Sequence, residues 1–276
     1  MSVLARLVRS REGIAGLVLL ALPVLAALAA PFLFPGDPLA IRGPALVPLL
    51  SDPAFPLGTD RLGRDVLAGL VHGARASLVV GLATAMVAVL FGALVGAVAG
   101  FAGGLVDEAL MRLTEAFQTV PGFLLALAFV SVAGASLPVV VLAIALGAWT
   151  GPARLARAEV LSIRERDYVA AARVVGMRPA EIALREILPN ALPPVLALSS
   201  VIVANAILVE AALSFLGLGD PNIVTWGSMI AEGRNVLRSA PFLSIVPGLG
   251  LVFTVLGVYL VSEGLAEALA ARKAKG

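Results

Sequence analysis

Six apolar segments, each close to the length that crosses a lipid bilayer, dominate the chain. They are Ile14–Phe34, Ala76–Gly100, Ala116–Ala133, Leu137–Ala153, Ala191–Leu213 and Phe242–Val261. A helix needs about 20 apolar residues to cross about 30 Å of hydrocarbon. Lipid offers no partner to backbone N–H and C=O groups, so each spanning segment must satisfy its own hydrogen bonds as a helix. The sequence therefore predicts an all-α, polytopic membrane protein with six transmembrane helices.

Composition supports this class and excludes others. Hydrophobic residues make up 60% of the chain and charged residues 14%, against about 45–50% and about 25% in soluble domains. The absence of cysteine excludes a disulfide framework and a thiolate metal cluster. The only lysines, Lys273 and Lys275, lie in the last four residues, so a phosphate-binding P-loop cannot be built. A net charge of +2 gives no indication of nucleic-acid binding.

The positions of the cations predict the orientation. With the N-terminus inside, most Arg and Lys residues fall on the cytoplasmic side, and the densest group lies between the fourth and fifth segments. We therefore expect both termini in the cytoplasm. A cleaved signal peptide is the alternative for Ile14–Phe34, but its apolar run exceeds the usual length of about 7–15 residues. The predicted parts are a tail (1–13), the first helix (14–34), an outer loop (35–75), a five-helix core (76–263) with a cytoplasmic loop (154–190), and a second tail (264–276).

The outer loop is predicted to be irregular over Pro35–Asp60 and then to form a short amphipathic helix. Thr59 or Asp60 could cap that helix, since both accept hydrogen bonds from free backbone N–H groups. Two i,i+4 ion pairs are expected on it, Asp60 with Arg64 and Arg61 with Asp65.

Inside the predicted helices, a glycine repeat indicates close helix packing and one acidic residue is a functional candidate. Gly92, Gly96 and Gly100 recur every four residues and favour close helix packing, which is more often intramolecular than between subunits. Glu210 is an acid within a membrane segment, which makes it a functional candidate as a gate residue. A buried structural hydrogen bond is the alternative for Glu210, and it is the one we prefer.

The segment from Asp167 to Asn190 is charged and compact, in contrast to its neighbours. Ala170, Ala171 and Ala172 favour helix, Gly176 can end that helix, and Pro179 suits the first turn of a second one. Pro189 is expected to end the second helix. Ile182, Ile187 and Leu188 remain apolar. The residues alone leave two interpretations open: a knob that fits a partner's groove, or an amphipathic elbow on the lipid surface.

This segment resembles the coupling loop, or EAA loop, of permease subunits of ATP-binding-cassette importers. The matching residues are Ala170-Ala171-Ala172, Gly176 and Ile187-Leu188-Pro189, with Ala170 in place of the family's leading glutamate. The chain is also similar, over nearly its whole length, to the second permease of dipeptide, oligopeptide and nickel importers. The stretches that carry this similarity are "PLGTDRLGRDVL", "GARASL", "VDEALMRLTEAF", "ILPNALPPVL", "EAALSFLGLG" and "SAPFLSIVPGL". The family's usual C-terminal sequence is only partly present, as "EGLAEALAARKAKG".

The resemblance implies a type I importer permease in the bacterial plasma membrane. Its partners would be a homologous permease, two cytoplasmic ATPase subunits that hold ATP and magnesium, and an external substrate-binding protein. No catalytic residue, cofactor or metal is implied on this chain. The resemblance assigns ATPase coupling to the loop, in which Gly176 sets the bend, Ala171 and Ala172 allow close packing, and Ile187 and Leu188 anchor the loop. The full set implied for coupling is Asp167, Tyr168, Ala170, Ala171, Ala172, Gly176, Pro179, Ile187, Leu188, Pro189 and Asn190.

Peptides are the expected substrate, with nickel or glutathione as alternatives. A self-contained secondary transporter would show inverted repeats and intramembrane ion-binding groups, and no clear repeat is present. A membrane enzyme would have to use His72, the only histidine, but no Gly-x-Ser-x-Gly motif accompanies it. A metal site at His72 would need carboxylates to complete it.

Overall fold

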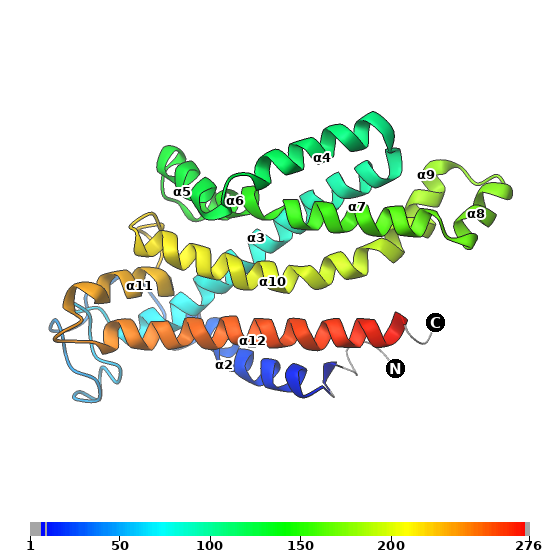
Figure 1. Cartoon of the computed structure of the whole chain (residues 1–276). Helices are drawn as coiled ribbons and strands as arrows, with labels where there is room; N and C mark the ends of the chain where they lie inside the picture. The colour runs from blue at the N-terminus through cyan, green and yellow to red at the C-terminus, as the bar shows by residue number, and fades with distance from the viewer. Residues whose placement is uncertain (1–6, 9, 274–276) are drawn as a thin grey trace.

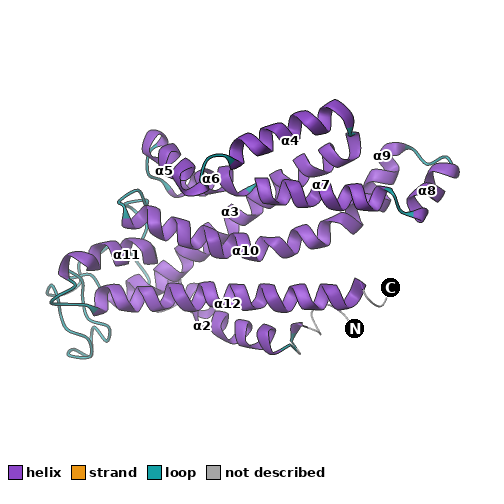
Figure 2. Cartoon of the chain, viewed as in Figure 1, coloured by secondary structure: helices purple, strands orange, loops and turns teal. Residues whose placement is uncertain are grey.

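The computed structural model describes residues 7–8 and 10–273, with side chains up to residue 267. The described chain is helical without a sheet, and its only β-type pairings are isolated bridges such as Ile41 with Arg64. Figures 1 and 2 show the long helices lying side by side, with irregular chain gathered mainly at one end. The all-α prediction is confirmed.

Helices α2 (Arg11–Leu33) and α12 (Phe242–Lys273) pack against each other on one side of the molecule (Figure 1). They approach closely at Gly16, where an added Cβ would lie 2.6 Å from the backbone nitrogen of Val261. Large apolar side chains on the outer surface of α2 are exposed, among them Leu22 and Phe32. This side of the molecule therefore suits contact with lipid.

Helix α3 (Val66–Ala102) merges the predicted amphipathic helix and the second predicted span into one element. Its N-cap is Asp65, which accepts hydrogen bonds from the N–H groups of Leu67 and Ala68. The prediction of Thr59 or Asp60 as the cap is wrong, because both side chains stabilise the preceding loop instead. Thr59 donates to the carbonyl of Pro44 at 2.6 Å, and Asp60 Oδ1 accepts from two N–H groups of its own turn.

The expected ion pairs on this segment have different outcomes. Asp60 and Arg64 lie 4.0 Å apart and form the predicted pair. No Arg61–Asp65 pair forms in the described structure, because Asp65 caps α3. Arg64 also reaches Glu232 at 3.3 Å and so joins the outer loop to a later helix.

The third and fourth predicted spans are each a bent pair of helices. The first pair is α4 (Gly104–Gln118) and α5 (Gly122–Ala133), which meet at 82°. The second is α6 (Leu137–Ala148) and α7 (Thr150–Arg164), which meet at 44°. Ala116–Ala133 is therefore not one helix. Pro121 explains the break, because it lacks an N–H donor and disfavours helical geometry in the residue before it.

The remaining elements follow in order. They are α8 (Asp167–Val174), α9 (Pro179–Ile182), a π-helical turn (Ala183–Ile187), α10 (Leu188–Phe215), α11 (Trp226–Gly233) and a 3₁₀ turn (Arg234–Val236). Within the described chain, four helices are long and apolar enough to cross a membrane, and the number rises to six if each bent pair counts as one span. The structure thus agrees with a multi-pass protein of up to six spans.

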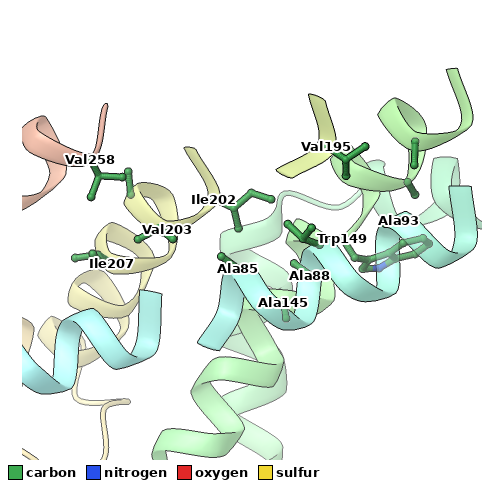
Figure 3. Close-up of a cluster of buried hydrophobic side chains, with 14 residues drawn as sticks. Ala85, Ala88, Ala93, Ala145, Trp149, Val195, Ile202, Val203, Ile207 and Val258 are labelled. Atoms are coloured by element: carbon green, nitrogen blue, oxygen red, sulfur yellow. The ribbon is translucent and has the colours of Figure 1, made fainter. Parts of the chain in front are cut away.

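The glycine stripe of α3 brings that helix against α7. An added Cβ would lie 2.3 Å from the carbonyl oxygen of Trp149 at Gly92, and 2.0 Å from that of Ala153 at Gly96. The stripe therefore serves packing within the chain, as expected. Figure 3 shows the cluster of buried side chains that continues from this contact toward α10 and α12. Trp149 anchors it with edge-to-face contacts to Phe91 and Phe117.

Candidate functional site

The helical elbow formed by α8, α9 and the π-helical turn projects from one end of the molecule (Figure 1). The first turn of α2 and the last turns of α12 lie toward this same end, whereas α11 and the loop 35–65 lie at the other. This arrangement agrees with the predicted placement of the elbow and both termini on one side of the membrane.

A Schellman turn fixes the bend between α8 and α9. Gly176 has φ +86°, in the left-handed region that favours glycine. Its N–H donates to the carbonyl of Arg173 at 3.0 Å, and the N–H of Met177 donates to the carbonyl of Ala172 at 3.1 Å. These two bonds are the pair that closes a Schellman motif. The predicted bend at Gly176 is confirmed, and Pro179 opens α9 as expected.

A buried apolar cluster anchors the elbow to the helix bundle. Its centre is Ile187, which is 1% exposed, together with Val169 of α8, Ile182 of α9 and Val160 of α7. Ala172 and Met177, the two residues joined across the turn, pack against the same cluster. The elbow is therefore held against α7 and α10 by a shared apolar core.

Pro189 does not end the second helix, contrary to the prediction. The chain stays helical from Pro179 to Phe215, with the wider π-helical turn Ala183–Ile187 just before the proline. A proline ring collides with the carbonyl four residues earlier in a regular α-helix. A π-turn displaces that carbonyl, and here the N–H of Leu188 reaches back five residues to Ala183.

The outer surface of the elbow exposes apolar side chains among charged ones such as Asp167, Arg173 and Arg178. Val174 and Val175 are 88% and 82% exposed, and Tyr168 and Leu184 are also open. The sequence reasoning missed these valines, because a Val-Val pair before a glycine fits a buried helix end equally well. In the structure α8 buries Val169 instead and leaves Val174 and Val175 on its exposed side.

The other predicted coupling residues divide into exposed and anchoring ones. Asp167 begins α8 and is exposed, and its negative charge at a helix N-terminus is favourable. Ala170 and Ala171 are exposed on the same helix. Leu188 is half-buried, and Asn190 donates from its amide to the carbonyl of Glu186, a bond within the helix.

Arginines tie the elbow to the bundle. Arg164 donates to the carbonyl of Gly100 at the end of α3, at 2.9 Å. Arg173 of α8 donates to the carbonyl of Arg164 at 3.3 Å. Beneath the turn, these two side chains line a hollow of about 310 Å³ together with Met177 and Pro179. These two hydrogen bonds link α8 to α7 and α7 to the end of α3.

Glu210 lies far along α10 from the elbow, in a buried polar group. Its side chain is 2% exposed and accepts a hydrogen bond from Ser214 at 2.6 Å. Thr225, the N-cap of α11, contacts Ser214 at 3.5 Å. The preferred structural role is supported by this geometry, which links α10 to the start of α11. His72 contacts the carbonyl of Phe34 at 3.0 Å, and no cluster of potential metal ligands occurs among the described residues.

Comparison with solved structures identifies the fold. The fold resembles that of a chain of the MetNI methionine ABC transporter in an inward-facing conformation, with a TM-score of 0.59 at 19% identity over 74% of this chain and 95% of the other. At this identity the likeness concerns the fold alone. It is the fold of an ABC-importer permease.

Sequence comparison then gives the family. Residues 88–275 match the family of the binding-protein-dependent transport system inner membrane component. The chain belongs to this family and is a multi-pass protein of the bacterial inner membrane. It is 42% identical to a probable peptide ABC transporter permease protein of Sinorhizobium fredii, over 88% of this chain and 83% of that protein. It is 37% identical to the di/tripeptide transport system permease protein DppC of Pseudomonas aeruginosa, over 94% and 88%.

Proposed function

We propose that this chain is a permease subunit of an ATP-driven peptide importer, and that the elbow Asp167–Asn190 docks a separate ATPase subunit. The observation that carries the docking assignment is the exposed Val174–Val175 pair. It lies beside a turn that two backbone hydrogen bonds close. Exposed valines would cost free energy in water and gain it in a partner's apolar groove. Because the apolar cluster already shapes the elbow, binding would require little ordering.

The peptide assignment rests on the two relatives, both of which are named as peptide transport proteins. Nickel and glutathione, the alternatives from the sequence, have no such support. The remaining partners follow from the same proposal. They are a homologous second permease across the translocation path, a second ATPase beneath it, and an external binding protein that delivers the peptide. ATP and magnesium would be held by the ATPases.

The proposed mechanism is mechanical. Closure of the ATPase pair would draw the elbow inward, and the buried contacts of Ile187 and Ile182 would carry that displacement into α10 and α7. The spans would then alternate between outward-open and inward-open states. This chain would carry no catalytic group for ATP hydrolysis.

Copurification tests the docking assignment. The double variant Val174→Asp, Val175→Asp is compared with wild type and with Leu237→Asp, an exposed apolar position at the opposite end of the molecule. We expect the ATPase to copurify with wild type and Leu237→Asp and to be lost from the double variant. Equal recovery with all three proteins would contradict docking at the elbow. Uptake of labelled dipeptides by the intact importer in vesicles tests the substrate.

A further inference from the structure

The side of the molecule formed by α4 and α7 differs in chemistry from the side formed by α2 and α12. Exposed residues of α2 include Leu22 and Phe32, which suit lipid. Helix α4, half of a bent pair that counts as one span only if its two helices are taken together, carries Asp107, Glu108, Arg112 and Glu115 beside exposed apolar residues such as Leu105. Charged groups facing hydrocarbon are costly, so charged positions in spans line water-filled paths or protein contacts. The mixed charged and apolar surface of the α4–α7 side therefore suits a protein contact or a water-filled path better than the apolar surface of α2 does.

A cavity of about 730 Å³ lies between these two helices. Figure 1 shows α4 and α7 running side by side between their bends and the elbow end of the molecule. This volume falls within the range of about 300–1,000 Å³ typical of small-molecule sites. Its walls carry charges of both signs, with Glu115 on α4 beside the neutral Gln118, and Arg154 and Arg157 on α7.

The two arginines of the cavity have different partners. Arg157 is occupied, because its guanidinium binds both carboxylate oxygens of Asp107. Arg154 donates to the amide oxygen of Gln118 at 3.2 Å, and this neutral partner does not compensate its charge. A guanidinium binds a carboxylate more strongly than an amide, through two parallel hydrogen bonds. Arg154 is therefore the group in this cavity best suited to bind an incoming carboxylate.

Glu115 supplies the opposite charge on the facing wall. It pairs with Arg112 at 3.8 Å, but both side chains are more than 60% exposed. Exposed pairs of this kind contribute little free energy, so Glu115 can exchange Arg112 for another cation at small cost. A peptide with free ends carries one carboxylate and one ammonium group. Arg154 on one wall could bind the carboxylate, and Glu115 on the other wall could bind the ammonium group.

We propose that the α4–α7 cavity is a transient peptide-binding site within the translocation path, where Arg154 with Gln118 holds the terminal carboxylate and Glu115 the terminal ammonium. This inference rests on the proposed peptide-import function and adds the residues that contact the substrate. The cavity is a relay site and not a high-affinity one, because its charged groups retain exchangeable partners.

The test uses the complete importer in proteoliposomes, with dipeptide-loaded binding protein outside and ATP inside. Arg154→Gln should lower the maximal dipeptide uptake about tenfold, the effect of losing one charge-assisted hydrogen-bonded contact. ATP hydrolysis stimulated by the loaded binding protein should stay unchanged, so that more ATP is used per peptide imported. Arg154→Lys, which keeps the charge but loses the planar fork, should give an intermediate rate. Glu115→Gln should also lower uptake.

Arg11→Gln is the matched control, since Arg11 is exposed at the start of α2, on the far side of the molecule from the cavity. It should import at the wild-type rate. Unchanged uptake in both Arg154→Gln and Glu115→Gln would overturn the site. Equal loss of uptake, ATP hydrolysis and copurifying permease in Arg154→Gln would also overturn it, because the cavity would then be a contact with the second permease. Failure of the wild type itself to import dipeptides would instead overturn the proposed substrate.

Discussion

Asp107 of α4 and Arg157 of α7 form a two-point ion pair. The Nε–Oδ1 and Nη2–Oδ2 distances are 2.5 and 2.7 Å. The contact joins the two bent membrane segments at the elbow end, while Pro121 breaks the first segment at its other end. The pair thus fixes the N-terminal end of α4 against α7. The bend after α4 determines the direction of the chain at the other end.

Separating this pair should destabilise the packing of α4 on α7. In a double-mutant cycle with Asp107→Asn and Arg157→Gln, we expect a coupling free energy of about 1 kcal/mol. A larger value is not expected, because about a third of the Arg157 side chain remains exposed. The measurement is thermal unfolding of the detergent-solubilised importer. Strict additivity of the two single effects would show that the contact contributes nothing.

Substitution of the glycine stripe should separate α3 from α7. Gly96→Ala places a Cβ 2.0 Å from the carbonyl oxygen of Ala153, a backbone atom that cannot move alone. We expect a loss of about 1–3 kcal/mol, as for other overpacked positions, seen as a lower melting temperature. Gly248→Ala is the control, because a Cβ there meets nothing within 4 Å. That control should be neutral or slightly stabilising, owing to the higher helix propensity of alanine.

The turn at Gly176 should depend on backbone conformation alone. No atom lies within 4 Å of an added Cβ, so the effect of a side chain there comes from the positive φ. Gly176→Val should cost about 1–2 kcal/mol locally and uncouple peptide uptake from ATP hydrolysis, with membrane insertion intact. Gly176→Asn should retain coupling, because asparagine tolerates the left-handed region. A fully active Val variant would argue against a conformationally fixed elbow.

Glu210 should act through its hydrogen bond with Ser214. Glu210→Ala removes the acceptor and leaves the buried hydroxyl of Ser214 without this partner, at a cost of about 1–3 kcal/mol. Glu210→Gln keeps an acceptor oxygen and should retain most of the stability and uptake. If Gln abolished uptake while the protein remained stable, the carboxylate itself would be required, and the gate role would replace the structural one.

Hydropathy was sufficient to predict the first, second, fifth and sixth spans as single helices, because lipid imposes both length and helicity, but it did not predict that the third and fourth are bent pairs. Where the prediction of a helix end failed, competing local hydrogen bonds decided the outcome. Asp65 caps α3 because the turn before it already uses Asp60, and helix α10 passes Pro189 because a π-turn displaces a carbonyl. Neither effect has a distinct sequence signal. The break at Pro121 did have a sequence signal, since proline followed by glycine within a predicted span favours a break.

The elbow was predictable in its bend but not in its exposed surface. Gly176 and Pro179 specify the turn by their backbone preferences alone. The outward placement of Val174 and Val175 depends on tertiary packing, because α8 turns the face that carries Val169 toward Ile187 and the rest of the cluster. The contact between Arg154 and Gln118 in the α4–α7 cavity likewise joins residues 36 positions apart, which no local pattern connects.

The most direct test of ATPase docking is cross-linking from single cysteines in native membranes. The chain has no cysteine of its own, so Val175→Cys and Leu237→Cys each provide one defined position without background. A short thiol-to-amine cross-linker should join position 175, at the exposed tip of the elbow, to an ATPase subunit, and should give no such product from position 237. Absence of the product at 175, or its equal formation at both positions, would contradict the proposed docking of an ATPase at the elbow.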